Sequence, residues 1–299
     1  MANLKSLAKD TAIYGMSSIL GRFLNYLLVP LYASDIFVAS GGYGVIINLY
    51  AYTALLLVIL TYGMETTFFR YANKTNEDPQ KVYSSTLIMV GFTSLLFIVL
   101  VSIFLQPLSG VMGYSDHRSY VWVMAATVSI DAFQCIPFAY LRYKNRPIKF
   151  AALKLLFVTF NIALNLLYFL VLPDLYKSYP EVIQYVYSPE TGVGYAFYIN
   201  LVCTASITFF FYKELTGFKY TFDKELAKRM LSYSWPILIL GIAGILNQNA
   251  DFILFPYLYK GSQVHQQLGI YGAASKIAMI MAMITQAFRY AYEPFVFGK

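Results

Sequence analysis

Several charged and amide side chains stand inside long apolar stretches of this sequence, where an unpaired charge is costly and marks a functional site by default. Arg22 lies near the middle of the first apolar stretch, and Asp131 lies near the middle of another. An arginine there can bind a phosphate group through its forked guanidinium. Arg22 can equally form an ion pair with Asp131. The residues leave open whether Arg22 has a binding role or a structural one.

A second polar group lies toward the C-terminus. Asn247, Gln248 and Asp251 fall within about one helical turn and therefore share a face. This face can line a cavity, or it can hydrogen-bond to a neighbouring helix. Lys276 lies near one end of the last apolar stretch and can line the same cavity or extend its ammonium group to the membrane interface. For Lys154, extension to the interface is the expected behaviour.

Composition identifies the elements that must position these side chains. The chain has 12% charged, 59% hydrophobic and 18% aromatic residues, whereas ordinary soluble domains carry about 25% charged residues. Eight apolar stretches are long enough to cross a ~30 Å hydrocarbon layer as helices. They cover roughly residues 11–34, 43–69, 82–105, 119–141, 150–172, 194–212, 232–258 and 269–292. The sequence therefore predicts an all-α, polytopic membrane protein with eight transmembrane helices.

The loops carry a strong charge asymmetry. With alternating loops, fifteen lysines and arginines fall on one side of the membrane and three, Arg118, Lys177 and Lys260, on the other. Positive residues concentrate on the cytoplasmic side, so we expect a multi-pass membrane protein with a cytoplasmic N-terminus. These charges are spread over membrane-proximal loops, which favours membrane lipids over nucleic acid as their partners.

Motifs for catalysis, metals or cofactors are not recognisable in the sequence. Cys135 and Cys203 both fall inside predicted spans and form no CxxC pair, so neither a disulfide framework nor a zinc site is expected. His117 and His265 lie in predicted exterior loops and are interpreted as solvated. A nucleotide-binding motif is also missing. We expect no cofactor, and coupling to protons, sodium or the membrane potential stays open.

An internal repeat relates the two ends of the chain. A shift of 226 residues aligns the first stretch with the seventh and matches Pro30 with Pro256. A shift of 228 residues aligns the second stretch with the eighth and matches Glu65 with Glu293. Six spans per unit give a first lobe at residues 1–222 and a partial second lobe at residues 223–299. Such parallel repeats are related by an axis along the membrane normal. The chain stops directly after the eighth span, which we interpret as a truncation.

The repeat also pairs the polar residues. The shift of 226 residues places Arg22 opposite Gln248 and Asn25 opposite Asp251. Two related polar faces, one from each lobe, would then meet at a central cavity. The candidate substrate-binding residues are Arg22, Asn25, Asp131, Asn247, Gln248, Asp251 and Lys276.

Five segments carry a resemblance to a known family. They are KDTAIYGMSSILGRFLNYLLVPLYA from Lys9, LRYKNRPIKFAALK from Leu141, NQNADFILFPYL from Asn247, GIYGAASKIAMIM from Gly269 and QAFRYAYEPF from Gln286. With them the chain resembles the polysaccharide biosynthesis family of O-antigen-type oligosaccharide flippases, in the multidrug/oligosaccharidyl-lipid/polysaccharide exporter superfamily. The resemblance covers essentially the whole chain, although family members typically contain more than eight spans.

This resemblance implies a transporter of the bacterial inner membrane and not an enzyme. Its expected cargo is an undecaprenyl-pyrophosphate-linked oligosaccharide for surface polysaccharide such as lipopolysaccharide O-antigen. The two lobes are expected to move this cargo by alternating access. Polysaccharide assembly proteins are the expected partners. A cation-coupled multidrug exporter of the same superfamily is an alternative, and it would favour an acidic residue such as Asp131 in the first-lobe cavity. A membrane glycosyltransferase or polymerase is a further alternative, but the carboxylates in the exterior loop at 173–193 show no grouping.

Overall fold

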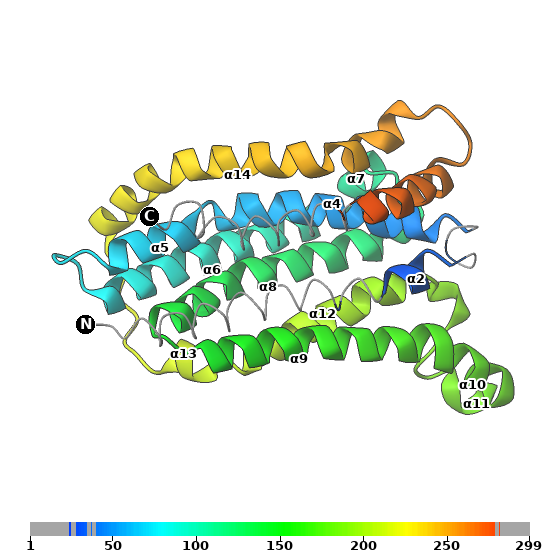
Figure 1. Ribbon diagram of the computed structural model, residues 1–299, viewed down its shortest axis with the longest axis horizontal. Coiled ribbons are helices and arrows are strands. Elements are labelled where there is room, and N and C mark those ends of the chain that lie inside the picture. The colour runs from blue at the N-terminus through cyan, green and yellow to red at the C-terminus, as the bar shows by residue number, and fades with distance from the viewer. Residues whose placement is uncertain (1–23, 25–27, 35–36, 38–39, 279–280, 282–299) are drawn as a thin grey trace.

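The computed structural model describes residue 24 and residues 28–34, 37, 40–278 and 281. These residues form a bundle of helices without a strand among them (Figure 1). In chain order the helices are α2 (Val29–Tyr32), α4 (Gly42–Thr61), α5 (Met64–Ala72), α6 (Pro79–Ile103), α7 (Leu105–Val111), η1 (Ser115–His117), α8 (Arg118–Tyr143), α9 (Pro147–Leu166), η2 (Leu167–Val171), α10 (Leu172–Ser178), α11 (Pro180–Ile183), η3 (Pro189–Thr191), α12 (Gly194–Phe209), α13 (Tyr212–Thr216) and α14 (Lys224–Leu258). Residues 264–278 are also helical.

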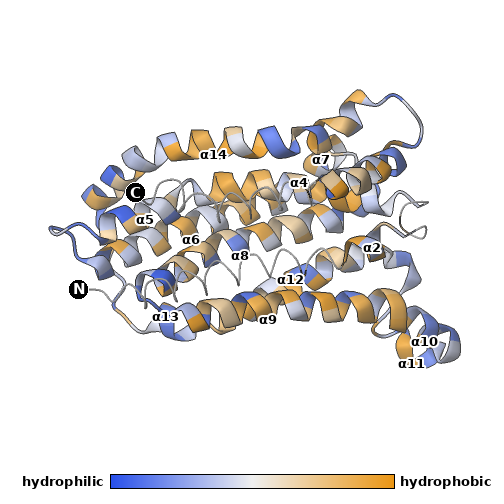
Figure 2. Cartoon of the chain, in the orientation of Figure 1, coloured by the Kyte–Doolittle hydropathy of each residue, from blue (hydrophilic) through white to orange (hydrophobic). Residues whose placement is uncertain are grey.

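Five helical segments of the described chain are long and apolar enough to cross a membrane: 42–72, 79–103, 115–143, 147–178 and 224–258. Apolar residues fill their middles, and hydrophilic residues gather in the loops at both ends of the bundle (Figure 2). The all-α, polytopic membrane fold predicted from the sequence is thus confirmed. The sixth predicted span appears as α12, a shorter apolar helix. Most of the first and eighth predicted spans lies outside the described residues.

Two of the long helices begin at an aspartate that caps the helix. The Asp78 carboxylate accepts a hydrogen bond from the Gln80 N–H at the start of α6, and the Asp223 carboxylate accepts one from the Leu226 N–H at the start of α14. Each cap satisfies one of the backbone donors that a helix leaves unpaired at its first turn. The caps explain why these helices start before the apolar runs at 82 and 232.

The second predicted span is broken, although the sequence predicts one continuous helix at 43–69. Helix α4 ends at Thr61, and α5 starts at Met64. Tyr62 and Gly63 between them have φ angles of 33° and 72°, in the left-handed region. Glycine adopts that region without steric cost, and here the missing side chain also admits Ile237 of α14, because a Cβ on Gly63 would lie 2.8 Å from it.

Helix α8 forms the centre of the bundle, and α14 forms an edge. In the most apolar stretch of each helix, 72% of α8 is buried inside the protein, against 11% of α14. Helices α4, α6, α9 and α12 all pack on α8, whereas α14 packs on α4, α5 and α6 (Figure 1). Helices α9 and α14 therefore lie on opposite edges, and the side chains of α8 are the ones that an internal cavity must include.

The end of the bundle that holds the loops at 73–78, 144–146 and 217–223 is called here the basic end. Ion pairs fasten its helices together, with 2.7 Å between Lys81 and Asp223 and 2.6 Å between Arg229 and Glu77. At this end Glu214 is buried, and its carboxylate lies 2.5 Å from the Lys149 ammonium. Helices α10 and α11 lie at the opposite end (Figure 1).

At that opposite end, the segment 264–278 packs closely on α4. A Cβ on Gly44 would lie only 1.9 Å from the backbone oxygen of His265, so only glycine permits this approach. His265 itself is half-buried and so less solvated than predicted, and its Nδ1 atom is buried and has no hydrogen-bond partner among the described residues. His117 is exposed as predicted, and its ring stacks on Tyr120.

Candidate functional site: a charged cavity inside the helix bundle

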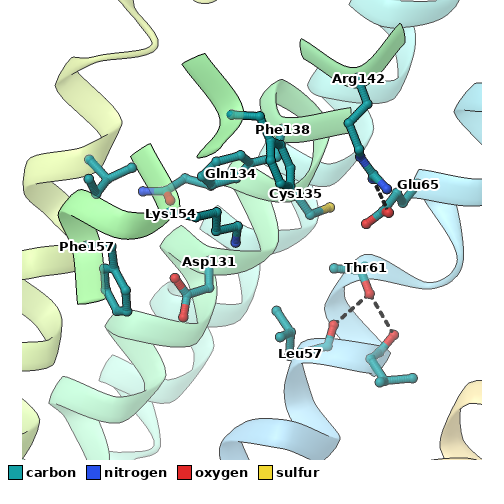
Figure 3. A pocket seen from close by; sticks show the side chains of 13 residues that line it. Leu57, Thr61, Glu65, Asp131, Gln134, Cys135, Phe138, Arg142, Lys154 and Phe157 are labelled. Atoms are coloured by element: carbon teal, nitrogen blue, oxygen red, sulfur yellow. Dashed lines mark hydrogen bonds and ion pairs between the residues drawn. The ribbon is translucent and has the colours of Figure 1, made fainter. Parts of the chain in front are cut away.

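A cavity of about 490 Å³ lies inside the bundle, between α4, α5, α8, α9 and α12. Apolar and aromatic side chains form most of its wall, and four charged side chains enter it (Figure 3). Its lining residues are Leu57, Val58, Thr61, Glu65, Asp131, Gln134, Cys135, Phe138, Arg142, Phe150, Lys154, Phe157 and Ile207. A mostly apolar cavity with a few converging polar groups is the usual form of a ligand site.

Helical periodicity brings these residues together. Asp131, Cys135, Phe138 and Arg142 recur every three or four positions along α8 and so face the cavity as one stripe. Phe150, Lys154 and Phe157 form a similar stripe on α9. Because α8 is central and α9 peripheral, the cavity lies between an inner wall and an outer one.

Glu65 and Arg142 form an ion pair at the side of the cavity nearer the basic end (Figure 3). Glu65 lies in the first turn of α5, and Arg142 lies in the last turn of α8. Each charge is therefore placed where it opposes the local helix dipole. The guanidinium also lies over the ring of Phe69, 5.0 Å from its centroid. This pair fastens α5 to α8.

Asp131 and Lys154 carry the other two charges. The Asp131 carboxylate accepts a hydrogen bond from the Thr204 hydroxyl at 3.3 Å. The Lys154 ammonium lies 4.1 Å from the centroid of the Phe138 ring and faces Asp131 (Figure 3). Asp131 and Lys154 form no direct ion pair, but their opposite charges still attract each other across the cavity.

Lys154 is the cation of this cavity that is not held in an ion pair among the described residues. Its side chain is surrounded by protein, yet it keeps exposed surface because it lines an open cavity. An ammonium group is a compact charge with three donors and can bind an oxygen-rich anion. Phe138 stabilises the cation by a cation–π interaction without using up those donors.

The structure therefore corrects the sequence interpretation of Lys154. The sequence placed its ammonium group at the membrane interface, but it enters the cavity instead. Distance from a helix end indicates how deep a residue lies, and it does not indicate which way the side chain points. The one signal available in the sequence was that Asp131 and Lys154 are opposite charges in neighbouring spans.

Of the seven predicted substrate-binding residues, Asp131 lies in this cavity. Arg22 and Asn25 lie outside the described residues, so the proposed Arg22–Asp131 pair stays a prediction. Lys276 lines a second cavity of about 210 Å³ together with Tyr32, Tyr43 and other residues of α2, α4 and α14.

The three polar residues of α14 are not brought to the cavity of Asp131. Asn247, Gln248 and Asp251 are exposed on α14, where they form the hydrophilic stretch that interrupts this helix in Figure 2. The Asp251 carboxylate accepts a hydrogen bond of 2.5 Å from the Tyr271 hydroxyl. Their neighbour Asn249 lines the smaller cavity with Lys276. Their predicted role in substrate binding stays a prediction.

Interhelical hydrogen bonds occur beside these sites. Asn165 of α9 accepts a hydrogen bond of 2.5 Å from the Tyr32 hydroxyl of α2. Within its own helix it donates to the Asn161 backbone oxygen at 2.8 Å. Asn48 of α4 donates to the Phe252 backbone oxygen of α14 at 2.7 Å. Such bonds hold membrane helices together, and the Asn48 bond connects the two lobes that the sequence predicts.

Comparison with known proteins identifies the family. A solved structure, named only as "protein A", shares the fold with a TM-score of 0.65 at 15% sequence identity, over 99% of this chain. The chain spans 65% of the length of that protein. None of the curated proteins matches the sequence. A sequence model described as "polysaccharide biosynthesis protein" matches residues 7–291, nearly the whole chain. This chain therefore belongs to the polysaccharide biosynthesis protein family.

Proposed function

We propose that this chain is part of a flippase that moves an undecaprenyl-pyrophosphate-linked oligosaccharide across the bacterial inner membrane for surface polysaccharide synthesis. Its family is concerned with polysaccharide biosynthesis, and its helices are those of a polytopic membrane protein. The observation that carries the proposal is the Lys154 ammonium, which enters a cavity inside the apolar part of the bundle. Transport of an anionic lipid head group requires a cation at that depth.

The cavity has the chemistry that a pyrophosphate needs. Lys154 supplies a charge that is not engaged in an ion pair with any other described residue, and Arg142 supplies a guanidinium that suits phosphate geometry once Glu65 releases it. Asp131 offsets the Lys154 charge when the cavity holds no cargo. Arg22 and Asn25 are proposed to add donors from the first span. We propose that Asn247, Gln248, Asp251 and Lys276 contact the cargo from the second lobe.

The proposal includes an orientation. The basic end is assigned to the cytoplasm because the lysines and arginines of its loops follow the positive-inside rule. The charged cavity then lies closer to the face on which the cargo is assembled. Transport is driven by a proton or sodium gradient or by the membrane potential, without a bound cofactor. Polysaccharide assembly proteins are the proposed partners on the membrane.

Deletion of the gene from the chromosome tests this function, because it removes the whole encoded protein whatever its length. We expect loss of a surface polysaccharide and accumulation of its lipid-linked precursor on the cytoplasmic face. Restoration by the wild-type gene is the control. A strain that keeps its surface polysaccharides and accumulates no precursor would show that the chain is not such a flippase.

A cation-coupled multidrug exporter is the second candidate, favoured by the carboxylate of Asp131 inside the first-lobe cavity. The same deletion strain separates the two functions. An exporter of this kind predicts greater sensitivity to cationic drugs with normal surface polysaccharide, and Asp131→Asn would reproduce that sensitivity. The flippase predicts unchanged drug sensitivity.

A further inference from the structure

A lateral groove lies on the outside of the bundle, between α4, α6 and α14. It has a volume of about 520 Å³. Its walls are Ile59, Tyr62, Met89, Phe92, Thr93, Leu231, Ser234, Trp235 and Leu238. None of these residues is charged, and the helices that carry them are membrane-spanning segments. The groove thus lies in the apolar, membrane-spanning part of the described bundle.

The hydroxyl groups of the groove already have partners, and that of Tyr62 interacts with Thr93. The Thr93 hydroxyl donates to the backbone oxygens of Met89 and Val90, both at 3.1 Å. The Ser234 hydroxyl donates to the Leu231 oxygen at 3.1 Å. Side chains bonded to their own helix present mainly their carbon atoms outward. The groove thus offers apolar surface and asks for no polar partner, which suits a hydrocarbon chain.

Its walls are strongly aromatic. Phe92 and Trp235 are 64% and 63% exposed, and Tyr62, directly after α4, also lines the groove. Leaving such large rings uncovered is unfavourable at about 25 cal/mol per Å² of apolar area in water, and in a bilayer they are covered by lipid chains. Ring faces give good contacts to methyl branches, which an isoprenoid chain carries and a straight acyl chain lacks.

The groove and the charged cavity occupy two faces of the same helix at the same depth. Leu57, Val58 and Thr61 of α4 line the cavity, whereas Ile59 and Tyr62 line the groove. An α-helix with its side chains is about 10 Å across. The thickness of α4 therefore separates the cavity from the groove, near the break between α4 and α5.

We propose that this groove binds the isoprenoid chain of the lipid-linked cargo. The identity of that lipid rests on the proposed flippase function. The binding surface itself rests on the apolar lining, the satisfied hydroxyls and the position opposite the charged cavity. Head and chain would then be recognised separately, by Lys154 on one face of α4 and by Trp235 and Phe92 on the other.

The two tryptophans of the chain make this testable. Trp235 lines the groove, whereas Trp122 is on α8, with its indole N–H bonded to the Ser102 hydroxyl at 3.0 Å. The chain is placed in nanodiscs of phospholipids with brominated acyl chains, which quench tryptophan fluorescence on contact. The Trp122→Phe variant reports Trp235 alone, and the Trp235→Phe variant reports Trp122 alone. Undecaprenyl phosphate without bromine is then added.

We expect both tryptophans to be quenched at first, and undecaprenyl phosphate to relieve the quenching of Trp235 while leaving that of Trp122 unchanged. Failure of the brominated lipids to quench Trp235 would mean that protein covers the groove, and would overturn the proposal. A second outcome is that undecaprenyl phosphate relieves the quenching of Trp235 no more than that of Trp122. Ordinary phospholipid would then occupy the groove, which also overturns the proposal. Since the readout involves no transport, it is independent of the deletion experiment.

Discussion

Replacing Gly63 by alanine should destabilise the protein for two reasons that the structure separates. Gly63 has a φ of 72°, and a left-handed backbone costs an alanine about 1–2 kcal/mol. Its new Cβ would also lie 2.8 Å and 2.9 Å from the Cγ2 and Cβ atoms of Ile237. Overpacking of this kind costs about 1–3 kcal/mol. We expect a total loss of about 2–5 kcal/mol in the free energy of unfolding.

Gly113 provides the matched control. Its φ is 79°, and a Cβ there would meet nothing within 4 Å, so Gly113→Ala should lose only the backbone part, about 1–2 kcal/mol. Thermal unfolding of both purified variants in the same detergent gives the comparison, and Gly63→Ala should have the lower midpoint. Equal midpoints would show that α14 does not press on the α4–α5 break, and the described contact between the helices would be refuted.

Two further predictions concern the basic end. The Lys81 ammonium and the Leu226 N–H hold the pKa of the Asp223 carboxyl down at about 2, below its usual ~3.9. The stability that this carboxylate contributes should therefore be present above pH ~4 and disappear as the pH falls toward ~2. The measurement compares the unfolding stability of wild type and Asp223→Asn over this pH range. A difference between the two that stays constant would contradict the prediction. Glu214→Gln should lower the free energy of unfolding by about 1–3 kcal/mol, because the buried Glu214 carboxylate accepts a hydrogen bond of 2.5 Å from the Lys149 ammonium. Chemical denaturation measures this loss, and an unchanged stability would rule out the buried pair.

The fold could be predicted from the sequence where length and composition decide it. The apolar run at 119–141 predicts α8, which covers Arg118–Tyr143, because a helix is the form that satisfies its own backbone within a membrane. The break at Tyr62 and Gly63 could not be predicted in the same way. A single glycine inside an apolar run is tolerated in many helices, and here the close approach of Ile237 accompanies the break.

The candidate site could likewise be predicted from the sequence only in part. Asp131 could be selected from sequence because a carboxylate in the middle of a span is rare and costly, and the structure places it in the charged cavity. Lys154 could not, because the direction of a side chain around a helix axis depends on how α9 packs against α8. The outward position of Asn247 and Gln248 on α14 likewise depends on tertiary packing, which a shared helical face does not determine.

The central claim is that Lys154 binds the anionic head group of the cargo, and substitution at this residue tests it most directly. At the chromosomal locus, Lys154→Ala should reduce export of the lipid-linked oligosaccharide about tenfold to a hundredfold, since a hydrogen bond to a charged group is worth about 1.5–3 kcal/mol and 1.4 kcal/mol is a factor of ten. Lys154→Arg should keep most of the export, with protein abundance unchanged in both variants. The double variant Lys154→Ala with Asp131→Asn removes the unpaired carboxylate and should remain defective. Normal export by Lys154→Ala, or export restored in the double variant, would contradict the claim.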